Sequence, residues 1–160
     1  MDEVVREYMS ALYEERKKWL QHRAKSGPIG VSFSAGIDSG SVFLLTYHAL
    51  LELGESPSRL KAFTLSVDGK GDDLKQAREF LRAVNLELFL EPIEVKASGL
   101  DWKKTVQVVE DYKALDIQAA TMNLTLLEGI RSRYPEWKHI IDGDGGDENL
   151  KDYPIEENPE

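Results

Sequence analysis

One stretch of the sequence decides the fold of this chain, Ile29-Gly30-Val31-Ser32-Phe33-Ser34-Ala35-Gly36-Ile37-Asp38-Ser39. Its first five residues are mostly apolar, so they predict a short strand over 29–33. Small and polar residues follow, and the pattern over 39–53 then predicts a helix. A strand that turns through small residues into a helix brings backbone N–H groups and the positive end of the helix dipole together. This loop therefore predicts an anion-binding site, suited to phosphate.

Each residue type in the loop has a reason to be there. Small residues let a phosphate approach the main chain, Gly36 allows the turn, and Ser34, Ser39 and Ser41 add hydroxyl donors. Asp38 repels a phosphate unless a divalent cation lies between them, so we interpret it as a magnesium ligand. The Gly-Lys-Ser/Thr sequence of a Walker A loop does not follow. The alternative is a turn that merely fits the chain to a sheet, and the length of the string favours phosphate binding.

A second strand-to-loop edge occurs at His139-Ile140-Ile141, which precedes a loop rich in acids and glycines. The loop concentrates four carboxylates, which are Asp142, Asp144, Asp147 and Glu148. Crowded like charges are destabilising unless a cation compensates them, and a solvated acidic turn is the alternative. Ligands of open α/β sheets bind beyond the carboxyl ends of the strands. If strand 139–141 lies beside strand 29–33, Asp147 and Asp38 face each other and hold magnesium against ATP phosphates.

Alternating strands and helices are predicted along the rest of the chain. The expected elements are a helix at 2–25, a strand at 60–67, a helix at 72–84, a strand at 87–95 and helices at 102–112 and 116–134. Such alternation predicts an α/β fold, a three-layer doubly wound and mostly parallel sheet with helices on both faces. We expect one domain over residues 1–153, led by the helix at 2–25, and an acidic tail over 154–160. Because little follows the last strand, we expect the functional unit to continue in a removed C-terminal part or another chain.

The composition narrows the classes of function. With 160 residues, 41% of them hydrophobic, the chain can bury one core. A net charge of −9 disfavours nucleic acid as a partner, and the absence of cysteine excludes disulfides, thiolate metal sites and a cysteine glutaminase within this chain. No apolar run approaches the ~20 residues that span a bilayer. The acidic start is unlike a signal peptide, so we expect a cytoplasmic protein with no membrane partner.

The two loops together resemble those of glutamine-dependent asparagine synthetases and of their relative β-lactam synthetase, N-type ATP pyrophosphatases of the PP-loop superfamily. Members carry Ser-Gly-Gly-x-Asp-Ser in the first loop and Gly-Glu-Gly-x-Asp-Glu in the second. The corresponding stretches here are 34–39 and 143–148. The resemblance runs from the first helix to about Tyr153 and includes Ala62-Phe63-Thr64-Leu65-Ser66 and Ile117-Gln118-Ala119-Ala120-Thr121. It implies the PP-loop version of the α/β fold, with its C-terminal part missing from this chain.

Roles for individual residues follow from this resemblance. It implies that ATP is bound by Ser32, Ser34, Ala35, Gly36, Asp38, Ser39, Leu65, Gly143 and Gly145. It also implies that Asp38 and Asp147 hold Mg²⁺. Asp144 stands at the position of the acidic residue that helps the amine nucleophile in the family, and it is expected to be catalytic together with Glu148. Basic residues after the second strand, Lys70, Lys75 and Arg78, either approach phosphate or form a solvated helix face.

Some positions depart from the family pattern. Ala35 stands where members have glycine, Gly40 stands where they have serine, and Asp144 stands where they have glutamate. Members also have an N-terminal cysteine glutaminase domain and a catalytic lysine well after the second loop, and this chain lacks both. A partner chain is therefore expected to supply the rest of the synthetase domain or a glutaminase.

The implied activity is that of an AMP-forming carbon-nitrogen ligase. ATP activates a small-molecule carboxylate as an acyl-adenylate with release of pyrophosphate, and an amine or ammonia then forms the amide. One alternative is another PP-loop ATP pyrophosphatase, such as an NAD- or GMP-synthetase-like or a tRNA-modifying enzyme. The tRNA version predicts a basic face and the thiolating version predicts cysteines, and the composition supports neither. A second alternative is an ATP-binding subunit or fragment that needs a partner chain for catalysis.

Overall fold

The computed structural model describes residues 3–110 and 112–144. Within them the chain forms a parallel sheet with the strand order β3-β2-β1-β4. The strands are β1 (Ile29–Ser32), β2 (Leu60–Val67), β3 (Leu90–Val95) and β4 (His139–Ile141). The chain adds β2 and β3 on one side of β1 and then crosses back to add β4 on the other side of β1. The boundary between β1 and β4, at their carboxyl ends, is therefore the topological switch point of the sheet.

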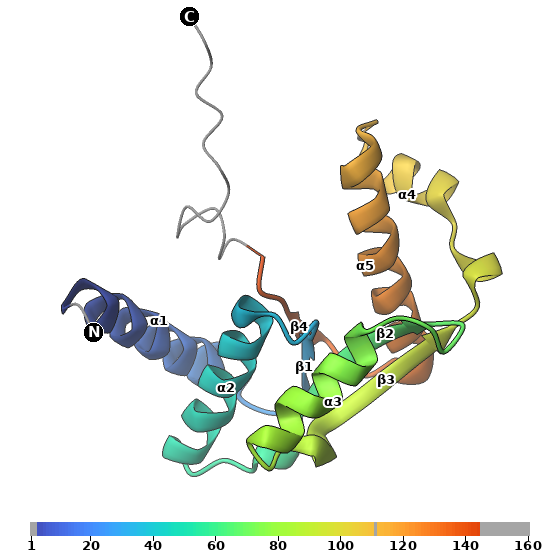
Figure 1. Cartoon of the computed structure of the whole chain (residues 1–160). Helices are drawn as coiled ribbons and strands as arrows, with labels where there is room; N and C mark the ends of the chain where they lie inside the picture. The colour runs from blue at the N-terminus through green and yellow to red at the C-terminus, as the bar shows by residue number, and fades with distance from the viewer. Residues whose placement is uncertain (1–2, 111, 145–160) are drawn as a thin grey trace, which may run out of the picture.

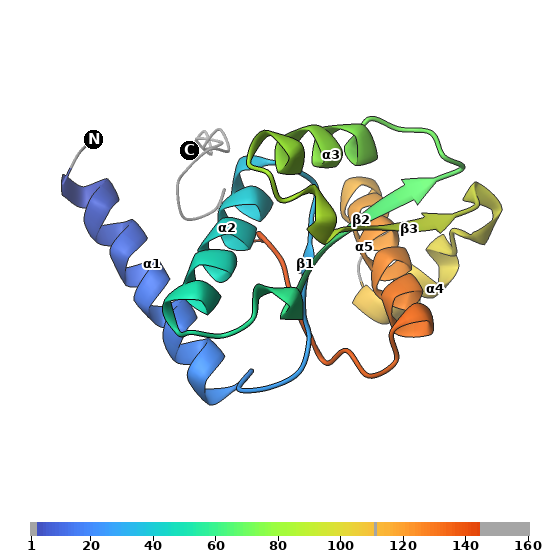
Figure 2. The same cartoon turned by 90° about the horizontal axis from the view of Figure 1, so that it is seen from below.

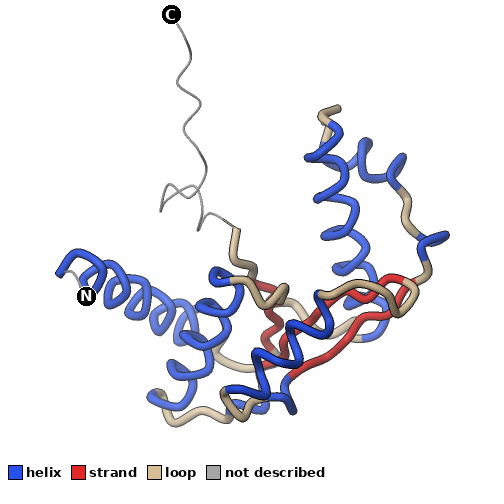
Figure 3. Tube along the Cα trace, in the orientation of Figure 1, coloured by secondary structure: helices blue, strands red, loops and turns tan. Residues whose placement is uncertain are grey.

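Helices cover both faces of this sheet. They are α1 (Glu3–His22), α2 (Ile37–Glu52), α3 (Asp73–Ala83), α4 (Trp102–Val109) and α5 (Ala114–Arg133). Figures 1 and 2 show α2 and α3 on one face and α5, with α4 beside it, on the other, and α1 packs against α2. The strands form the middle layer in Figure 3. The predicted doubly wound α/β fold is thus confirmed. No helix in the described residues is both long and apolar enough to cross a membrane.

Successive residues of β2 explain why the sheet has two cores. Side chains along a strand alternate between the faces. Leu60 and Ala62 join the larger cluster under α2 and α3, whereas Phe63 joins Ile93, Leu126 and Ile130 under α5. Each large apolar side chain buried in this way contributes roughly 1.5–3 kcal/mol. This burial supplies most of the free energy that holds the helices on the two faces of the sheet. The carboxyl ends of β1 and β2 therefore lie between two helical layers.

One predicted strand begins later than expected. Residues Glu87–Phe89 form a 3₁₀ turn, and β3 starts at Leu90. The Leu86 N–H donates to the Leu81 carbonyl and the Phe89 N–H donates to the Leu86 carbonyl, so this segment ends α3 instead of pairing with β2. Pairing with β2 begins at the Ala62–Leu90 register. In this turn Leu86 and Phe89, three residues apart, are buried, whereas Leu88 is 77% exposed. That spacing suits a 3₁₀ turn and differs from the alternation of a strand.

Candidate functional site

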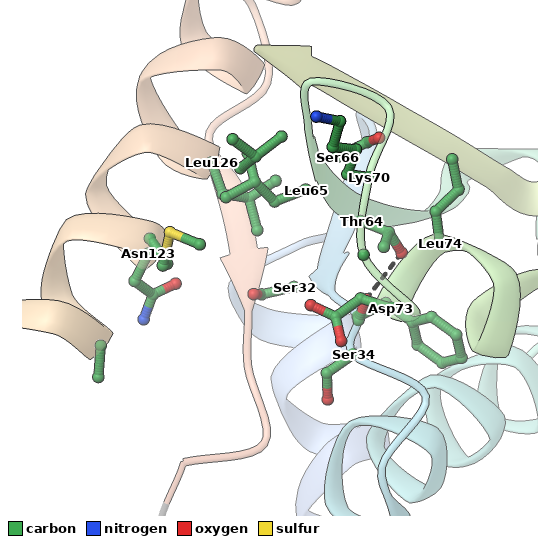
Figure 4. Close-up of a pocket in the computed structure, with 15 residues that line it drawn as sticks. Ser32, Ser34, Thr64, Leu65, Ser66, Lys70, Asp73, Leu74, Asn123 and Leu126 are labelled. Atoms are coloured by element: carbon green, nitrogen blue, oxygen red, sulfur yellow. Dashed lines mark hydrogen bonds between the residues drawn. The ribbon is translucent and has the colours of Figure 1, made fainter. Parts of the chain in front are cut away.

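The first loop is anchored to the neighbouring strand where it leaves β1. The Phe33 N–H donates to the Phe63 carbonyl at 2.8 Å, and the Thr64 hydroxyl donates to the Phe33 carbonyl at 2.7 Å. The second of these bonds is the dashed line in Figure 4. The chain then turns through 34–36 into α2, whose first helical residue is Ile37. The loop predicted from the sequence therefore stands at the carboxyl end of a central strand, held on its β2 side.

Serine hydroxyls brace the loop from inside. The Ser34 N–H donates to Ser39 Oγ at 3.2 Å, the two serine Oγ atoms lie 3.1 Å apart, and the Gly36 N–H donates to Ser34 Oγ at 3.4 Å. Ser39 is buried, whereas Ser34 is exposed. The two hydroxyls thus hold the ends of the loop close together, and Ser34 presents its oxygen to solvent.

The backbone N–H groups at the amino end of α2 can donate hydrogen bonds to a ligand. Its N-cap residue, Gly36, makes no side-chain capping bond. The first N–H groups of a helix have no partner within the helix, and the helix dipole makes this end positive. Neither residues 29–41 nor residues 139–148 contain lysine or arginine. An anion at this end is therefore met by backbone dipoles, and the half-buried Asp38 in the first turn adds a negative charge that a cation must offset.

The second loop meets the first one at Gly143. Strand β4 pairs with β1 in the register Ile29–His139 and Val31–Ile141, so both strands end at the same edge of the sheet. The predicted pairing of these two strands is confirmed. A Cβ atom on Gly143 would lie 2.7 Å from the Ser39 nitrogen and 2.9 Å from the Asp38 Cβ. Such contacts exclude any side chain, so a glycine is required for this close approach.

A cavity of about 310 Å³ opens beside the loops. Predicted site residues Ser32, Ser34 and Leu65 line it. Figure 4 shows these residues at the ends of β1 and β2, facing Asn123 and Leu126 of α5. The loop that follows β1, residues 34–39, is called the phosphate-type loop below. The cavity runs from this loop, across the end of β2, to α5 on the sheet face opposite α2.

Two groups of cavity residues were not predicted as part of the site. From α5 they are Ala119, Met122, Asn123 and Leu126, and from the segment before and at the start of α3 they are Gly71, Asp73 and Leu74. Periodicity in the sequence indicates the helix at 116–134 but not which face of the sheet it covers. The right-handed connection from β3 to β4 was the available indication, because it carries α5 to the face opposite α2.

Comparison with protein families identifies the chain. Residues 20–160 match the model of the family described as asparagine synthase. The chain belongs to the asparagine synthase family. A comparison with curated proteins gave no match.

Among solved structures, the NMN synthetase from Francisella tularensis is similar to this asparagine synthase family chain. The TM-score is 0.54 and the sequence identity is 17% over 88% of this chain and 56% of the other. At this identity the similarity supports the α/β fold alone. This chain spans little more than half the length of that solved structure.

Ala35 departs from the asparagine synthase family pattern, and its backbone conformation shows the effect of that departure. Its φ is 64°, in the left-handed region that glycine adopts without strain. A non-glycine residue there costs about 1 kcal/mol or more. The chain therefore keeps the loop conformation that suits glycine and carries a strained alanine in it.

Gly40 is a second departure, and a neighbouring helix explains it. A Cβ atom on Gly40 would lie 2.9 Å from Cζ of Phe80, a residue of α3. The Phe80 ring also packs edge to face on Phe33, with the ring centroids 5.5 Å apart. Phe80 thus fills the space that a side chain at position 40 would take, and its ring also contacts Phe33 at the other side of the loop.

Several predicted site residues lie outside the described residues. They are Gly145, Asp147 and Glu148. Asp144 is the last described residue and is exposed. Among residues 3–110 and 112–144, no group of three or more potential metal ligands gathers. The magnesium site of Asp38 with Asp147, and the catalytic roles of Asp144 and Glu148, therefore stay predictions.

Proposed function

We propose that this chain binds ATP with Mg²⁺ and uses it to activate a carboxylate as an acyl-adenylate. The contact of Gly143 with Asp38 and Ser39 carries the proposal. It joins the two loops that match the family pattern at the amino end of a 16-residue helix. The family match over residues 20–160 supports the same reading.

Binding is assigned to two parts of the site. The β- and γ-phosphates lie against the first-turn N–H groups of α2 and the hydroxyls of Ser34 and Ser39. Adenosine occupies the cavity between Leu65 and α5, with Met122 and Leu126 as apolar contacts. A volume of about 310 Å³ is at the lower end of the range for small-ligand pockets. The donor set of backbone amides, hydroxyls and one carboxylate fits a magnesium-bound polyphosphate.

The proposed chemistry relies on position and charge. A carboxylate oxygen of the acceptor attacks the α-phosphorus, the bond to the bridging oxygen breaks, and pyrophosphate leaves. An amine or ammonia then attacks the acyl carbon, loses a proton and displaces AMP. Asp38 and Asp147 would hold Mg²⁺, which when bound would neutralise charge on the departing pyrophosphate. The residues of the loop hold the pyrophosphate in line while the bond breaks.

A binding subunit completed by another chain is the second candidate, and exposed apolar side chains favour it. Ile37 at the start of α2 is 78% exposed, and Leu115 at the start of α5 is 79% exposed. We interpret these exposed apolar side chains as part of a surface that a partner chain covers. In this case the chain binds nucleotide alone, and catalysis requires the partner that supplies the remaining residues or the nitrogen donor.

Product analysis tests the proposal directly. The full chain is incubated with ATP, Mg²⁺, ammonium and a panel of carboxylates, and the nucleotide products are separated. AMP with pyrophosphate supports adenylation, whereas ADP with phosphate contradicts it. Nucleotide binding in calorimetry without either product supports the second candidate. Absence of magnesium-dependent nucleotide binding overturns both.

A further inference from the structure

The hydrogen-bond ladder between β1 and β2 stops one bond early. Its last paired residues are Ser32 and Phe63, and the Phe33 N–H still donates to the Phe63 carbonyl at 2.8 Å. In a regular parallel ladder the next bond would run from the Leu65 N–H to the Phe33 carbonyl. These two described residues do not form that bond, and β1 ends at Ser32. The Leu65 N–H is therefore left without the acceptor that a continued ladder would give it.

A buried hydroxyl takes the place of the missing ladder bond. The Thr64 hydroxyl donates to the Phe33 carbonyl at 2.7 Å, and the two residues are 1% and 2% exposed. Figure 4 shows this bond at the carboxyl ends of β1 and β2. A buried carbonyl needs a donor, and here a side chain provides the donor in place of the main chain of β2. The Thr64 hydroxyl and the Leu65 N–H are thus alternative donors to one carbonyl.

The Leu65 N–H points to the side of β2 on which β1 has ended. In a strand with a neighbour on each side, the backbone groups of alternate residues point to opposite neighbours. The Phe63 carbonyl accepts from β1, so Leu65, two residues later, points the same way. The Asp68 N–H belongs to the other set and donates to the Val95 carbonyl of β3 at 2.8 Å. Because Leu65 lines the cavity together with Ser34, its N–H is available to a ligand there.

The same hydroxyl fixes the first peptide group of the phosphate-type loop. The Phe33 carbonyl and the Ser34 N–H belong to one planar peptide group and point in opposite directions. Thr64 holds the carbonyl, and Ser39 Oγ accepts from the Ser34 N–H at 3.2 Å. Ser39 Oγ also lies 3.1 Å from Ser34 Oγ, which accepts from the Gly36 N–H. A rotation of this peptide group would therefore disturb the hydrogen bonds that brace the loop.

We propose that Thr64 is a positioning residue for nucleotide binding. Its hydroxyl holds the Phe33 carbonyl away from the Leu65 N–H, which keeps that N–H available to the nucleoside and keeps the phosphate-type loop in its binding conformation. Without the hydroxyl, the carbonyl turns to the Leu65 N–H, because a buried carbonyl that has no donor is costly. The sheet then gains a ladder bond and the site loses a donor. This inference rests on the proposed function, which assigns adenosine to the cavity and the phosphates to the loop.

Hydrogen exchange tests the ladder without any ligand. Exchange rates of the backbone amides are measured by NMR in the wild-type chain and in Thr64→Val, which keeps the shape of the side chain and removes the hydroxyl. In the wild type, Leu65 is expected to exchange about tenfold or more faster than Thr64 and Ser66, which pair with β3. In Thr64→Val, Leu65 is expected to exchange about tenfold more slowly than in the wild type, the upper range for one neutral hydrogen bond. A merely structural role of Thr64 predicts faster exchange in the variant.

Calorimetry tests the consequence for binding. Pyrophosphate with magnesium probes the phosphate-type loop, and adenosine probes the cavity beside Leu65. Thr64→Val is expected to bind each ligand about tenfold more weakly than the wild type does. Thr64→Ser keeps the hydroxyl and is expected to retain most of both affinities.

Thr46→Val is the matched control. Thr46 is fully buried, and its hydroxyl donates to the Val42 carbonyl at 2.7 Å, the same length as the bond from Thr64. Thr46 lies within α2 and does not line the cavity. Thr46→Val is therefore expected to lower the stability in urea unfolding, to bind both ligands like the wild type and to leave Leu65 faster in exchange than its neighbours.

Different failures have different meanings. If Leu65 exchanges as slowly as Thr64 and Ser66 in the wild type, the inference is overturned, and this measurement requires no variant to fold. Wild-type affinities in Thr64→Val overturn it as well, and so does a loss in Thr64→Ser as large as that in Thr64→Val. In these cases the proposed function stands as long as the wild type binds the ligands. If the wild type binds neither ligand, the proposed function is overturned, and the exchange rates still decide whether Thr64 ends the ladder.

Discussion

At the scale of single residues, the strained backbone of Ala35 has a measurable consequence. With a φ of 64°, Ala35 is expected to be less stable than glycine in the same position. Ala35→Gly relieves this strain but also gives the unfolded chain more conformational entropy, which partly offsets the gain. The net expectation is a free energy of unfolding that is higher by up to about 1 kcal/mol. Urea unfolding of the two proteins measures this difference.

A second alanine provides the opposite control. Ala11 lies in α1 and is exposed. Ala11→Gly should lower the free energy of unfolding by roughly 0.5–1 kcal/mol, the ordinary effect of glycine within a helix. If both substitutions lower the stability, Ala35 is not strained in solution.

Asp38 determines whether the phosphate loop works with a cation. Asp38→Asn keeps the size of the side chain and removes its charge, so the fold should persist while magnesium-dependent binding of pyrophosphate falls below detection in calorimetry. Asp72→Asn is the matched control, since Asp72 is exposed at the start of α3, makes no capping bond and does not line the cavity. Retention of pyrophosphate affinity by Asp38→Asn would remove Asp38 from the proposed metal site.

Residues of the phosphate-type loop could be predicted from sequence because their arrangement is local. Ser34, Gly36 and Ser39 lie within six positions, and a strand followed by a helix determines where they point. Asn123 could not be predicted in the same way. Its place in the cavity depends on which face of the sheet α5 covers, and the right-handed connection from β3 to β4 determines that face only once the strand order is known.

At the scale of elements, Phe80 couples α3 to the start of α2. Gly40→Ala should overpack against the Phe80 ring and lower the free energy of unfolding by about 1–3 kcal/mol. Phe80→Leu leaves a smaller, more adaptable side chain. The double variant should lose less stability than the sum of the two single variants, by about 0.5 kcal/mol or more.

The control for this coupling is a phenylalanine of the same core with different neighbours. Phe89 packs on Phe43 and Tyr47. Phe89→Leu and Gly40→Ala should therefore be additive within about 0.5 kcal/mol in urea unfolding. If the stability losses of Gly40→Ala and Phe80→Leu are also additive, a side chain at position 40 does not clash with the Phe80 ring.

The elements themselves follow the sequence patterns closely where the pattern is long. Strand β2 has the predicted bounds, and α3 and α5 differ from prediction by a few residues at their ends. The predicted strand over 87–95 includes the 3₁₀ turn at Glu87–Phe89 because an apolar run of this length, after a turn at Asn85, is compatible with either backbone conformation.

At the scale of the whole molecule, an ion-pair network joins the sheet to the α5 layer and makes stability depend on pH. Burial raises the pKa of Glu91, but hydrogen bonds from Lys61 and Tyr134 and the charges of Lys61 and Arg133 outweigh it, so the pKa lies below the ordinary value of 4.5. A lowered carboxyl pKa stabilises the fold above the unfolded-state value. That stabilisation is lost as the pH falls through the folded-state value.

The expected result is a fall in the free energy of unfolding as the pH drops below about 4.5. Exposed carboxyls with lowered pKa values, Glu52 beside Lys17 and Glu87 beside Arg82, act in the same direction. Glu91→Gln should be less stable at pH 7 and show a shallower dependence on acid. Urea unfolding between pH 3 and pH 7 measures both effects. If the free energy of unfolding depends on pH equally in the variant and the wild type, Glu91 is not the cause of the acid sensitivity.

The position of β4 beside β1 has a consequence for the order in which the protein is made. The phosphate-type loop emerges early in synthesis, but the strand that brings Gly143 against it begins only at His139. Pairing across so much intervening chain is slow to form and comes after the local βαβ units. A nascent chain released before this point is therefore expected to fold its first three strands without gaining nucleotide affinity, which makes the finished site a marker of complete translation to β4.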